Sequence, residues 1–485
     1  MTVSVQSSSA SFKYDQVSRY ITELIEKGDL KPGDKAPSLR NLSKELNVSI
    51  STVSQSYLSL EDQGVLTAKP QSGFFVNSMI NQIRNLPKTA SATGQPRRVK
   101  FGQLFEEIFA NANNPRIVPF GEAKPSMEFM PVKSLTRTTR SIISRHPKKC
   151  MDYCFPPGDR RLREQIVEQY AQINTRVSVD DVIITSGATE ALSLCLQTVA
   201  KRGDIIAVES PTYFAVLRMI EKMGMLALEI DTDPQTGMEM EALEEAFDTM
   251  DINALLASPN FSNPLGCLMP EDNKRELVHM LAERDVPLIE DDVYGNVYFG
   301  EKRPRTAKSY DLNNLVLSCS SFSKSLAPGF RVGWVLAGRY RNKVIELKQA
   351  TFSATSSINQ MAMAEFLASG QYDRHLVRFR VAMHDQVEKG RFMIAKSFPQ
   401  GTCISNPQGG NVLWVEMPRG CDSIEVFNRA LQQNIGITPG MLFSATRRFR
   451  NYLRINCGFP WDETNRQAIT TVGKIVSDVL AESSN

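Results

Sequence analysis

The sequence lacks long hydrophobic runs. None of its apolar stretches approaches the ~20 residues that a membrane-spanning helix needs, and its first residues, MTVSVQSSSASF, have neither the basic start nor the apolar core of a signal peptide. These absences argue against the membrane and secreted classes. We expect a soluble, cytoplasmic protein that has no membrane partner.

The eight cysteines are scattered, and no CxxC motif occurs among them. Cys150 and Cys154 stand closest together, but no second group of Cys or His accompanies them, as a structural zinc site would require. We therefore expect reduced thiols and no metal site.

A strong net charge is also missing, and the formal charge of +3 excludes a general polyanion binder. The charge is unevenly distributed. The first 100 residues hold 13 Lys and Arg against 8 Asp and Glu, a net +5, which leaves 43 against 45, a net −2, for the rest. The basic excess lies at the N-terminal end of a chain that is too long, at 485 residues, for one ordinary domain.

Between residues 14 and 76 the sequence predicts two helices, a third helix after a sharp turn, and two strands. KYDQVSRYITELIEKG predicts the first helix, with Gly28 as its end and with Val17, Ile21, Leu24 and Ile25 on its apolar face. SLRNLSKELN predicts a short helix capped by Ser38, with Leu39, Leu42 and Leu46 facing inward.

The third helix, ISTVSQSYLSLEDQG, would bury Val53, Tyr57 and Leu60, and GVLTAKPQSGFFV predicts two strands around a Pro-Gln-Ser-Gly turn. This order of elements is typical of a winged helix-turn-helix. We assign it to residues 12–78 and expect double-stranded DNA as its partner.

Residues 79–115 are predicted to be a linker, because they are rich in polar and turn residues and show no sustained period. The basic cluster PRRVK within it favours a solvated tether over a DNA-reading segment.

In residues 116–485 strand-like apolar runs alternate with helical stretches, which predicts a mostly parallel sheet covered by helices. From about Gln360 the pattern changes to long helices and a few strands, and predicts a small α+β lobe.

Unusual polar residues gather where the predicted strands end. Lys324 follows one strand in SCSSFSKSLAPGFRVGW, with Ser321, Ser323 and Arg331 close to it in sequence. The other strand ends carry Ser186, Gly187, Ala188 and Thr189 before a helix, Asp291, Asp292 and Tyr294 in LIEDDVY, and Asn263 in SPNFSNPLG. Because ligands bind at the carboxyl ends of strands in such sheets, we expect these residues to meet.

A lysine, a carboxylate, a phenol, an amide and a phosphate cradle together suit pyridoxal 5′-phosphate. The lysine forms a Schiff base, and the carboxylate keeps the pyridine nitrogen protonated. Each signal alone has an ordinary alternative, because a lone lysine is usually solvated and a Ser-Gly-Ala-Thr turn can simply cap a helix. Their common placement at strand ends favours the cofactor.

Two known families match these motifs. Residues 117–478 resemble a pyridoxal-phosphate-dependent aminotransferase of fold type I. PGDKAPSLRNLSKELNVSISTVSQSYLSLEDQGVL resembles the GntR-type winged helix, and the chain as a whole resembles a MocR-type transcriptional regulator.

The resemblance implies roles for individual residues. Lys324 would hold the cofactor as an aldimine, and Arg331 and Ser321 would contact its phosphate together with the turn from Ser186 to Thr189. Asp291 would pair with the pyridine nitrogen, with Asp292 as the alternative. The remaining roles would be ring stacking by Tyr213, hydrogen bonds to the ring oxygen from Tyr294 and Asn263, phosphate contact in the neighbouring subunit by Tyr153, and binding of a substrate carboxylate by Arg454. A homodimer with shared sites follows from the role of Tyr153.

The chain departs from both family patterns. Ala123, in AKP, stands where relatives often have glycine, and Asn411 stands where a larger apolar residue is expected, so the amino-acid ligand stays open. In the winged helix, Ile50 occupies a position where relatives often have arginine.

The third helix therefore offers mainly short polar side chains to DNA. The expected DNA-binding residues are Arg40, Ser49, Ser51, Thr52, Ser54, Gln55 and Lys69. The alternative for the serines is that they only cap and solvate the helix.

The leading hypothesis is a transcriptional regulator that binds DNA and senses pyridoxal phosphate, or its adduct with an amino acid or amine, through aldimine exchange. A working aminotransferase with an attached DNA-binding domain is the alternative. A cofactor-free, purely dimerising use of the fold is less consistent with Lys324, Asp291, Tyr294 and Arg331.

Overall fold

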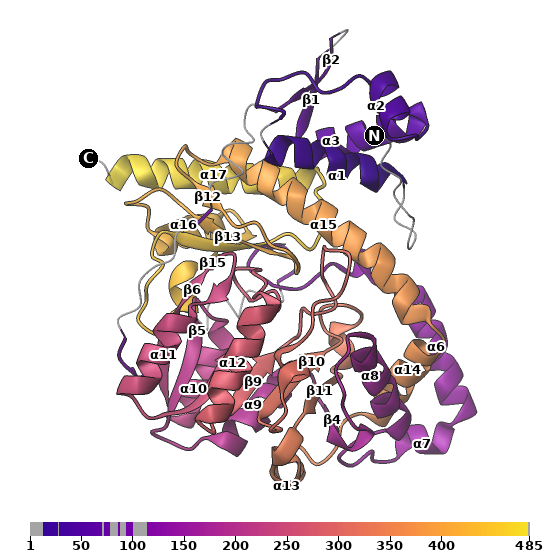
Figure 1. Ribbon diagram of the computed structural model, residues 1–485, viewed down its shortest axis with the longest axis vertical. Helices are drawn as coiled ribbons and strands as arrows, with labels where there is room; N and C mark the ends of the chain where they lie inside the picture. Colours follow the sequence, from indigo (N-terminus) through magenta and orange to yellow (C-terminus); the bar gives the residue numbers. More distant parts are fainter. Residues whose placement is uncertain are drawn as a thin grey trace.

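The computed structural model describes residues 13–27, 29–69, 72–77, 86–87, 94–99 and 114–483, without the side chains of residues 13–15, 26 and 62. Figure 1 shows an N-terminal unit resting against a much larger body. Residues 70 and 71 of the predicted wing turn, and most of the predicted linker, lie outside the described residues.

The N-terminal unit has the predicted order of elements, α1 (Lys13–Glu26), α2 (Leu39–Glu45), α3 (Ile50–Asp62), β1 (Leu66–Lys69) and β2 (Gly73–Val76). The two strands pair antiparallel. Val53, Tyr57 and Leu60 of α3 are buried against the other helices, as the sequence predicts.

The starts of α2 and α3 follow from side-chain capping. The Ser38 hydroxyl accepts a hydrogen bond from the backbone N–H of Asn41 at 3.2 Å, and the Ser49 hydroxyl accepts one from Thr52 at 3.1 Å. Each serine thus satisfies a backbone donor that has no partner within its helix.

An eight-stranded sheet forms the centre of the large domain (Figure 1). Its order is β4 (Val182–Thr185), β11 (Gly333–Leu336), β10 (Val316–Ser321), β9 (Leu288–Asp291), β8 (Ile252–Ala257), β5 (Ile205–Ser210), β6 (Leu226–Asp233) and β7 (Gly237–Met238). The strands from β10 to β6 run parallel, whereas β11 is antiparallel to both neighbours and β7 is antiparallel to β6. The mostly parallel sheet is therefore confirmed.

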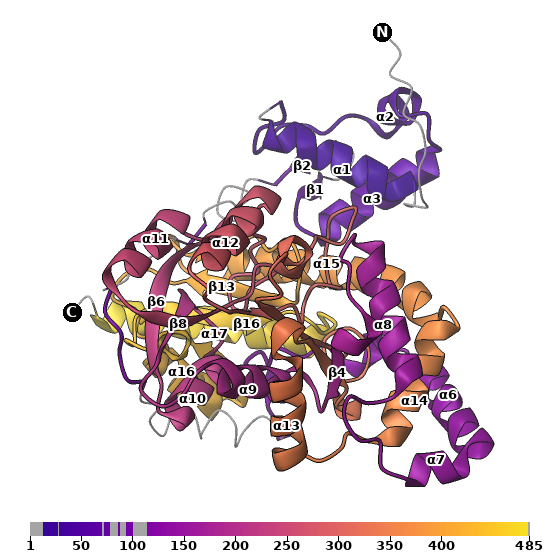
Figure 2. The same ribbon diagram turned by 60° about the horizontal axis from the view of Figure 1, so that its bottom comes forward.

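Helices cover both faces of this sheet, as Figure 2 shows. The helices of the large domain are α6 (Val132–Arg145), α7 (Pro147–Met151), α8 (Arg160–Gln172), α9 (Ala188–Val199), α10 (Phe214–Met223), α11 (Met240–Thr249), α12 (Glu271–Glu283), α13 (Arg341–Thr351) and α14 (Ser357–Ala368). Alternate strand residues face opposite layers: Leu256 packs with α9 and α10, and Leu255 packs with α11 and α12. Burial on both faces explains why these strands are apolar throughout.

The small lobe contains a four-stranded sheet in the order β12 (Cys403–Ile404), β13 (Val412–Glu416), β16 (Tyr452–Asn456) and β15 (Thr438–Pro439). The helices of this part are α15 (Gln371–Ser397), α16 (Ser423–Gln432) and α17 (Glu463–Ser483). A separate parallel pair joins β3 (Val118–Pro119) to β14 (Ile435–Gly436). Short 3-10 helices lie at Met127–Phe129, Val179–Asp181, Ala307–Tyr310, Pro328–Phe330, Gly338–Tyr340 and Gly440–Phe443.

Helix α15 links distant parts of the molecule (Figure 1). Near its start, the Tyr372 hydroxyl lies 2.7 Å from the Ser325 hydroxyl in the large domain. Near its end, Phe392 lies against Gly64 of the N-terminal unit, so closely that a Cβ on Gly64 would overlap the ring. Arg19 and Glu301 form a second contact between the two units, at 3.3 Å.

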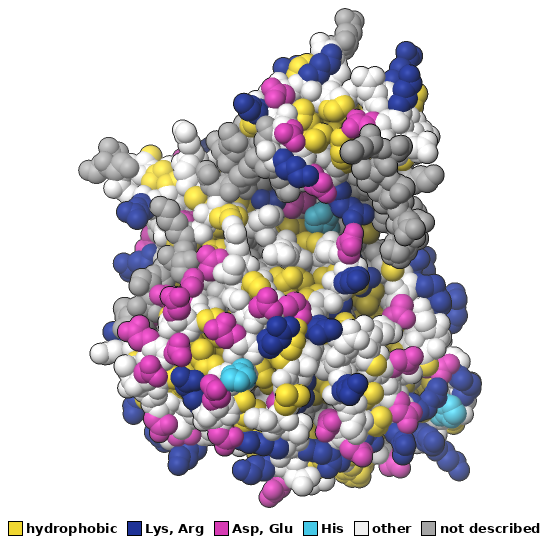
Figure 3. Space-filling view, in the orientation of Figure 1, with side chains coloured by type: hydrophobic (Ala, Val, Ile, Leu, Met, Phe, Trp, Pro, Cys, Tyr) yellow, Lys and Arg dark blue, Asp and Glu magenta, His cyan; other side chains and the backbone are white. Residues whose placement is uncertain are grey.

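Among the described residues, the helices are all too short or too polar to cross a bilayer. In Figure 3 acidic and basic side chains intermingle over the visible face of the large body, in agreement with its small net charge.

Candidate functional site

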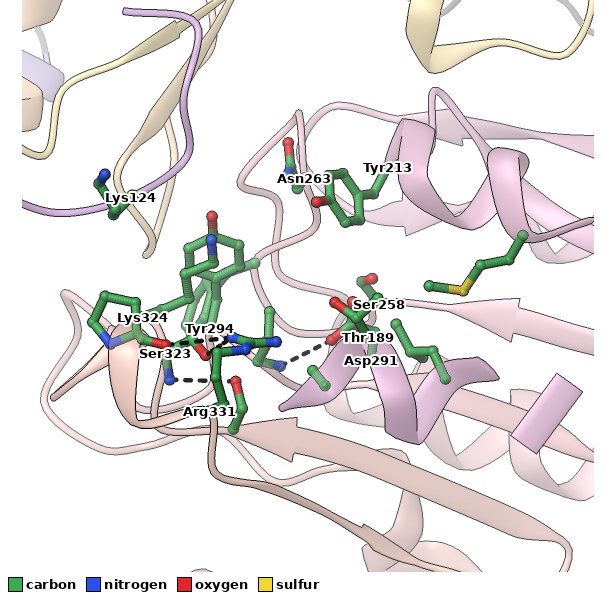
Figure 4. A pocket seen from close by; sticks show the side chains of 17 residues that line it. Lys124, Thr189, Tyr213, Ser258, Asn263, Asp291, Tyr294, Ser323, Lys324 and Arg331 are labelled. Atoms are coloured by element: carbon green, nitrogen blue, oxygen red, sulfur yellow. Dashed lines mark hydrogen bonds between the residues drawn. The ribbon is translucent and has the colours of Figure 1, made fainter. Parts of the chain in front are cut away.

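A cavity of about 250 Å³ lies where several sheet strands end at their carboxyl edges (Figure 4). Its polar lining comes from Lys124, Thr189, Tyr213, Ser258, Asn263, Asp291, Tyr294, Ser321, Ser323, Lys324 and Arg331. Residues that are widely separated in the sequence thus meet in one place, as the strand-end positions predicted.

Lys324 is enclosed in this cavity, three residues after β10 ends. Its Nζ donates a hydrogen bond to the carbonyl oxygen of Ala123 at 2.6 Å. Burial and the neighbouring Arg454 lower the pKa of Lys324 to about 8. A substantial fraction of the amine is therefore neutral near physiological pH, and only the neutral amine can attack a carbonyl group.

The structure distinguishes the two adjacent carboxylates at the end of β9, Asp291 and Asp292. Asp291 lines the cavity and accepts a hydrogen bond from the backbone N–H of Val293 at 3.1 Å. Burial raises the pKa of Asp291 to about 6. Asp292 instead pairs with Arg303 at 2.5 Å and accepts a hydrogen bond from Asn260 at 2.9 Å, away from the cavity lining.

Arg331 lies beside the start of α9 and forms one corner of the cavity. Its guanidinium donates to the carbonyl oxygen of Ser186 at 3.1 Å and to the Ser323 hydroxyl at 3.3 Å. Gly187 has a φ of 89° and faces this guanidinium so closely that a Cβ would overlap it. The position therefore requires glycine for both backbone and space.

The four residues predicted for this turn divide into two pairs. Ala188 and Thr189 line the cavity in the first turn of α9, where backbone N–H groups lack partners within the helix. Ser186 and Gly187 are not part of the lining, and both contact Arg331. The N–H of Ser186 donates to the Glu190 carboxylate at 2.5 Å. The corner thus combines helix N–H groups, a guanidinium and the hydroxyls of Ser321 and Ser323.

The remaining lining groups are aromatic and amide side chains. Tyr213 precedes α10, and the Tyr294 hydroxyl donates to the carbonyl oxygen of Ala123 at 3.3 Å. Burial raises the pKa of both tyrosines, so both stay protonated and able to donate hydrogen bonds. Asn263 completes this side of the cavity (Figure 4).

Arg454 of β16 is buried beside the cavity but is not part of its lining. It donates to the Thr438 hydroxyl at 3.1 Å, to Asn263 at 3.5 Å and to the carbonyl oxygen of Gly121. Its buried Nε has no hydrogen-bond partner within the described part of the chain. Such a guanidinium retains capacity for an anion.

Tyr153 lies elsewhere. Its side chain is 75% exposed and stacks on Phe155 with the ring centroids 5.4 Å apart. It contributes nothing to the cavity lining of its own chain.

Sequence reasoning missed Ser258 and Lys124, and it named Ser323 beside Lys324 without giving it a role. Ser258 directly follows β8 and Ser323 shares the loop of Lys324, so their strand-end positions could have indicated both. Lys124 reaches the cavity from a segment some 200 residues before Lys324, and only folding brings the two together.

The N-terminal unit places most of the predicted DNA-binding residues at its surface. Arg40, Ser49, Ser51, Gln55 and Lys69 are exposed, whereas Thr52 and Ser54 are half-buried. The Ser49 hydroxyl lies 2.8 Å from that of Ser51 and 2.7 Å from that of Thr52, so capping occupies part of this hydroxyl cluster. Lys69 lies over the Phe75 ring at 4.3 Å.

Two family models match the chain. The model for bacterial regulatory proteins of the gntR family matches residues 13–76, and the model for aminotransferases of class I and II matches residues 125–472.

The chain is 39% identical to the HTH-type transcriptional regulator YjiR of Escherichia coli K12 over 464 residues, which cover 96% of this chain and 98% of the relative. It is 34% identical to the regulator YdcR of the same organism, covering 96% of this chain and 100% of the relative.

Solved aminotransferase structures match the larger part of the chain. One is the α-aminoadipate aminotransferase LysN from Thermus thermophilus, complexed with N-(5′-phosphopyridoxyl)-L-leucine, with a TM-score of 0.73 and 26% identity over 79% of this chain and 97% of that one. Another is a Pyrococcus horikoshii kynurenine aminotransferase, also with a TM-score of 0.73 and 26% identity, over 79% of this chain and 96% of that one. The chain belongs to the MocR-type transcriptional regulators, in which a gntR-family DNA-binding region precedes an aminotransferase-like domain.

Proposed function

We propose that this regulator holds pyridoxal 5′-phosphate at Lys324 and binds double-stranded DNA through its N-terminal unit, so that the state of the cofactor site changes transcription. The observation that carries the proposal is the meeting of Lys324, Asp291 and Arg331 in one cavity of a chain that begins with a winged helix. We propose that the regulator acts in the cytoplasm, where DNA and the cofactor are both available.

The residues of the cavity fit this cofactor. The corner formed by Arg331, Ser321, Ser323 and the start of α9 suits a phosphate, because it offers a guanidinium, hydroxyls and free N–H groups. Asp291 would pair with the pyridine nitrogen, and Tyr213 would stack on the ring. When bound, the cofactor supplies an electrophilic carbon and an electron-withdrawing ring.

The hydrogen bonds that surround the ring oxygen would come from Asn263 and Tyr294. Lys324 would provide the covalent link. Its lowered pKa supports this role, since the amine must lose its proton before it reacts.

We propose residues 12–78 as the DNA-binding domain, 79–115 as a linker and 116–485 as the cofactor-binding domain. In the first domain, the exposed side of α3 would enter the major groove, and Arg40 and Lys69 would contact backbone phosphates. Ser51 and Gln55 would face the bases. Short hydroxyls give weak base readout, so tight binding would need two copies of the domain.

A homodimer with shared cofactor sites would provide these two copies. Tyr153, Phe155 and Met151 are 75%, 59% and 77% exposed and lie close together in sequence beside α7. Large apolar side chains at such exposure favour a protein contact. We propose that a second copy covers them and that Tyr153 reaches its cofactor phosphate.

Sensing would follow from exchange of Lys324 for the amine of an amino acid or another amino compound. Arg454 would bind the carboxylate of such a compound and thereby shift the small lobe. Two contacts support transmission to the DNA-binding unit, namely Phe392 against Gly64 and Arg19 with Glu301. The ligand changes DNA binding only if it favours one arrangement of these contacts over another.

Aminotransferase turnover is the second candidate function. Lys324 with a pKa of about 8 can carry a proton in either direction, and Arg454 offers a carboxylate site. The likeness to solved aminotransferases supports this alternative without assigning a substrate.

The deciding experiment titrates the protein, loaded with pyridoxal phosphate, with amino acids and amines while its visible absorbance and its operator binding are recorded. A stable spectral change accompanied by altered DNA binding would support the regulator. Conversion of the cofactor to pyridoxamine phosphate, and its return with a keto acid, would show turnover. No visible band after loading would refute the cofactor proposal.

A further inference from the structure

The segment from Gly121 to Lys124 contacts both Lys324 and Arg454 through its backbone and contributes Lys124 to the cavity lining. The carbonyl oxygen of Ala123 accepts hydrogen bonds from Lys324 at 2.6 Å and from the Tyr294 hydroxyl at 3.3 Å. The carbonyl oxygen of Gly121 accepts one from Arg454. The backbone of this segment therefore joins the lysine to the buried arginine.

Lys124 is the side chain of this segment that lines the cavity (Figure 4). Its Nζ pairs with Glu122 at 2.8 Å, with side-chain exposures of 51% for the lysine and 20% for the glutamate. A half-exposed ion pair of this kind adds little stability, so a ligand anion can replace Glu122 at small cost.

The charges of the cavity wall also favour a ligand anion at Lys124. Its cationic groups are Lys124, Lys324 and Arg331, against the single carboxylate of Asp291. A cofactor phosphate would occupy Arg331, and the cofactor aldehyde would occupy Lys324. Lys124 then remains as the lining cation that the cofactor would not occupy. The buried Nε of Arg454, whose guanidinium also donates to Asn263, stays available for a carboxylate.

We infer that Lys124 selects a ligand with a second anionic group, and that the sensed compound is an α-amino acid with a side-chain carboxylate. The inference rests on the proposed function. Arg454 would bind the α-carboxylate, and Lys124 would bind the distal one by giving up Glu122. An amino acid with a neutral side chain of equal length would leave Lys124 paired with Glu122, and its binding affinity would gain nothing from the lysine.

The test compares acidic amino acids with neutral ones of similar length by calorimetry on the full chain loaded with pyridoxal phosphate. L-Glutamate and L-2-aminoadipate are titrated beside L-glutamine and L-norleucine. We expect the acidic amino acids to bind at least about tenfold more tightly, since a charge-assisted hydrogen bond replaces a neutral contact. Glutamine binding as tightly as glutamate would overturn the assignment.

Substitutions at position 124 separate charge from packing. Lys124→Met keeps most of the side-chain length and should reduce the preference for glutamate over glutamine to near unity, while glutamine affinity stays unchanged. Lys124→Arg should retain the preference, and Lys133→Met, at an exposed site on α6, should leave it intact. A preference that survives in Lys124→Met would refute the proposal.

Cofactor occupancy, measured by visible absorbance in each variant, separates failure of the proposed sensing from failure of the role of Lys124. If every amino acid fails to bind although the cofactor is present, the proposed sensing is wrong, and this inference falls with it. If amino acids bind without preference for an acidic side chain, sensing stands and only the role of Lys124 is wrong. Preference for a basic ligand, abolished in Glu122→Gln, would assign selection to Glu122 instead.

Discussion

The polar groups of the cavity around Lys324 are buried, whereas those on the exposed face of the N-terminal unit are in contact with solvent. In the cavity, burial moves the pKa of Lys324 to about 8 and that of Asp291 to about 6. On the N-terminal face, Arg40, Ser51 and Lys69 stay exposed to solvent. One buried group can contribute strongly to ligand binding because desolvation strengthens each of its contacts. Exposed groups each contribute little, and the affinity for DNA is the sum of many such contacts.

The largest effect is expected for Lys324→Ala. Loss of the covalent link should abolish the visible band and weaken pyridoxal phosphate binding by about two orders of magnitude, because only noncovalent contacts remain. Absorbance and fluorescence titration measure both. Lys133→Ala serves as the control, and an unchanged band in Lys324→Ala would contradict the assignment.

The neighbouring carboxylates Asp291 and Asp292 should respond differently to replacement by asparagine. Asp292→Asn leaves Arg303 buried without its counter-charge, and we expect a loss of about 3–5 kcal/mol in the free energy of unfolding. Asp291→Asn should cost less than about 1 kcal/mol but weaken the cofactor and shift its absorbance. Urea denaturation and absorbance titration of both variants provide the comparison. The roles are reversed if Asp292→Asn alone changes the spectrum.

The cavity should also impose a pH dependence. Burial lowers the pKa of Lys324 from its ordinary value, so the reactive neutral amine predominates above about pH 8. Below that pH the rate of cofactor capture should fall by about tenfold per pH unit and level off above it. Stopped-flow absorbance measures this rate. A rate that still rises steeply up to pH 10 would indicate an ordinary lysine.

Single substitutions on the DNA-binding face should have smaller effects. Arg40→Ala and Lys69→Ala should each weaken operator binding by about threefold to tenfold at low salt and reduce the salt dependence by about one phosphate contact. Fluorescence anisotropy at several salt concentrations measures both quantities. An effect that does not vary with salt would argue against phosphate contacts.

The smallest effects separate capping from DNA contact among the serines. Ser49→Ala removes the cap of α3 and should destabilise that helix by about 1 kcal/mol, visible as faster amide hydrogen exchange. Ser51→Ala should leave exchange nearly unchanged and weaken operator binding slightly. If both variants exchange alike, Ser49 does not act mainly as a cap.

Local pattern was sufficient to predict the N-terminal unit. Its helix starts depend on Ser38 and Ser49, and its core follows from apolar residues such as Val53 and Leu60 at helical spacing. Both signals act over a few residues, so the sequence displays them directly. The same holds for the strands of the large domain, whose continuous apolar runs reflect burial on both faces.

The cavity was only partly predictable. Strand ends brought Lys324, Asp291, Asn263 and Thr189 together, because parallel strands share their carboxyl edge. Sequence left Asp291 and Asp292 as alternatives, and the positions of Arg303 and Asn260 distinguish them. It also predicted Ser186 and Gly187 as ligand contacts, and this stays a prediction: the structure places both against Arg331 and outside the cavity lining.

The sequence by itself determined the order of the two units, the mostly parallel sheet and the residue types that gather at its edge, since helical period, strand burial and capping are local. Only the tertiary structure decided which of those residues face one another. Lys324 meets the carbonyl oxygen of Ala123 across about 200 residues of chain, and Phe392 meets Gly64 across more than 300. Such contacts depend on how complete layers pack, and no short stretch of sequence carries that information.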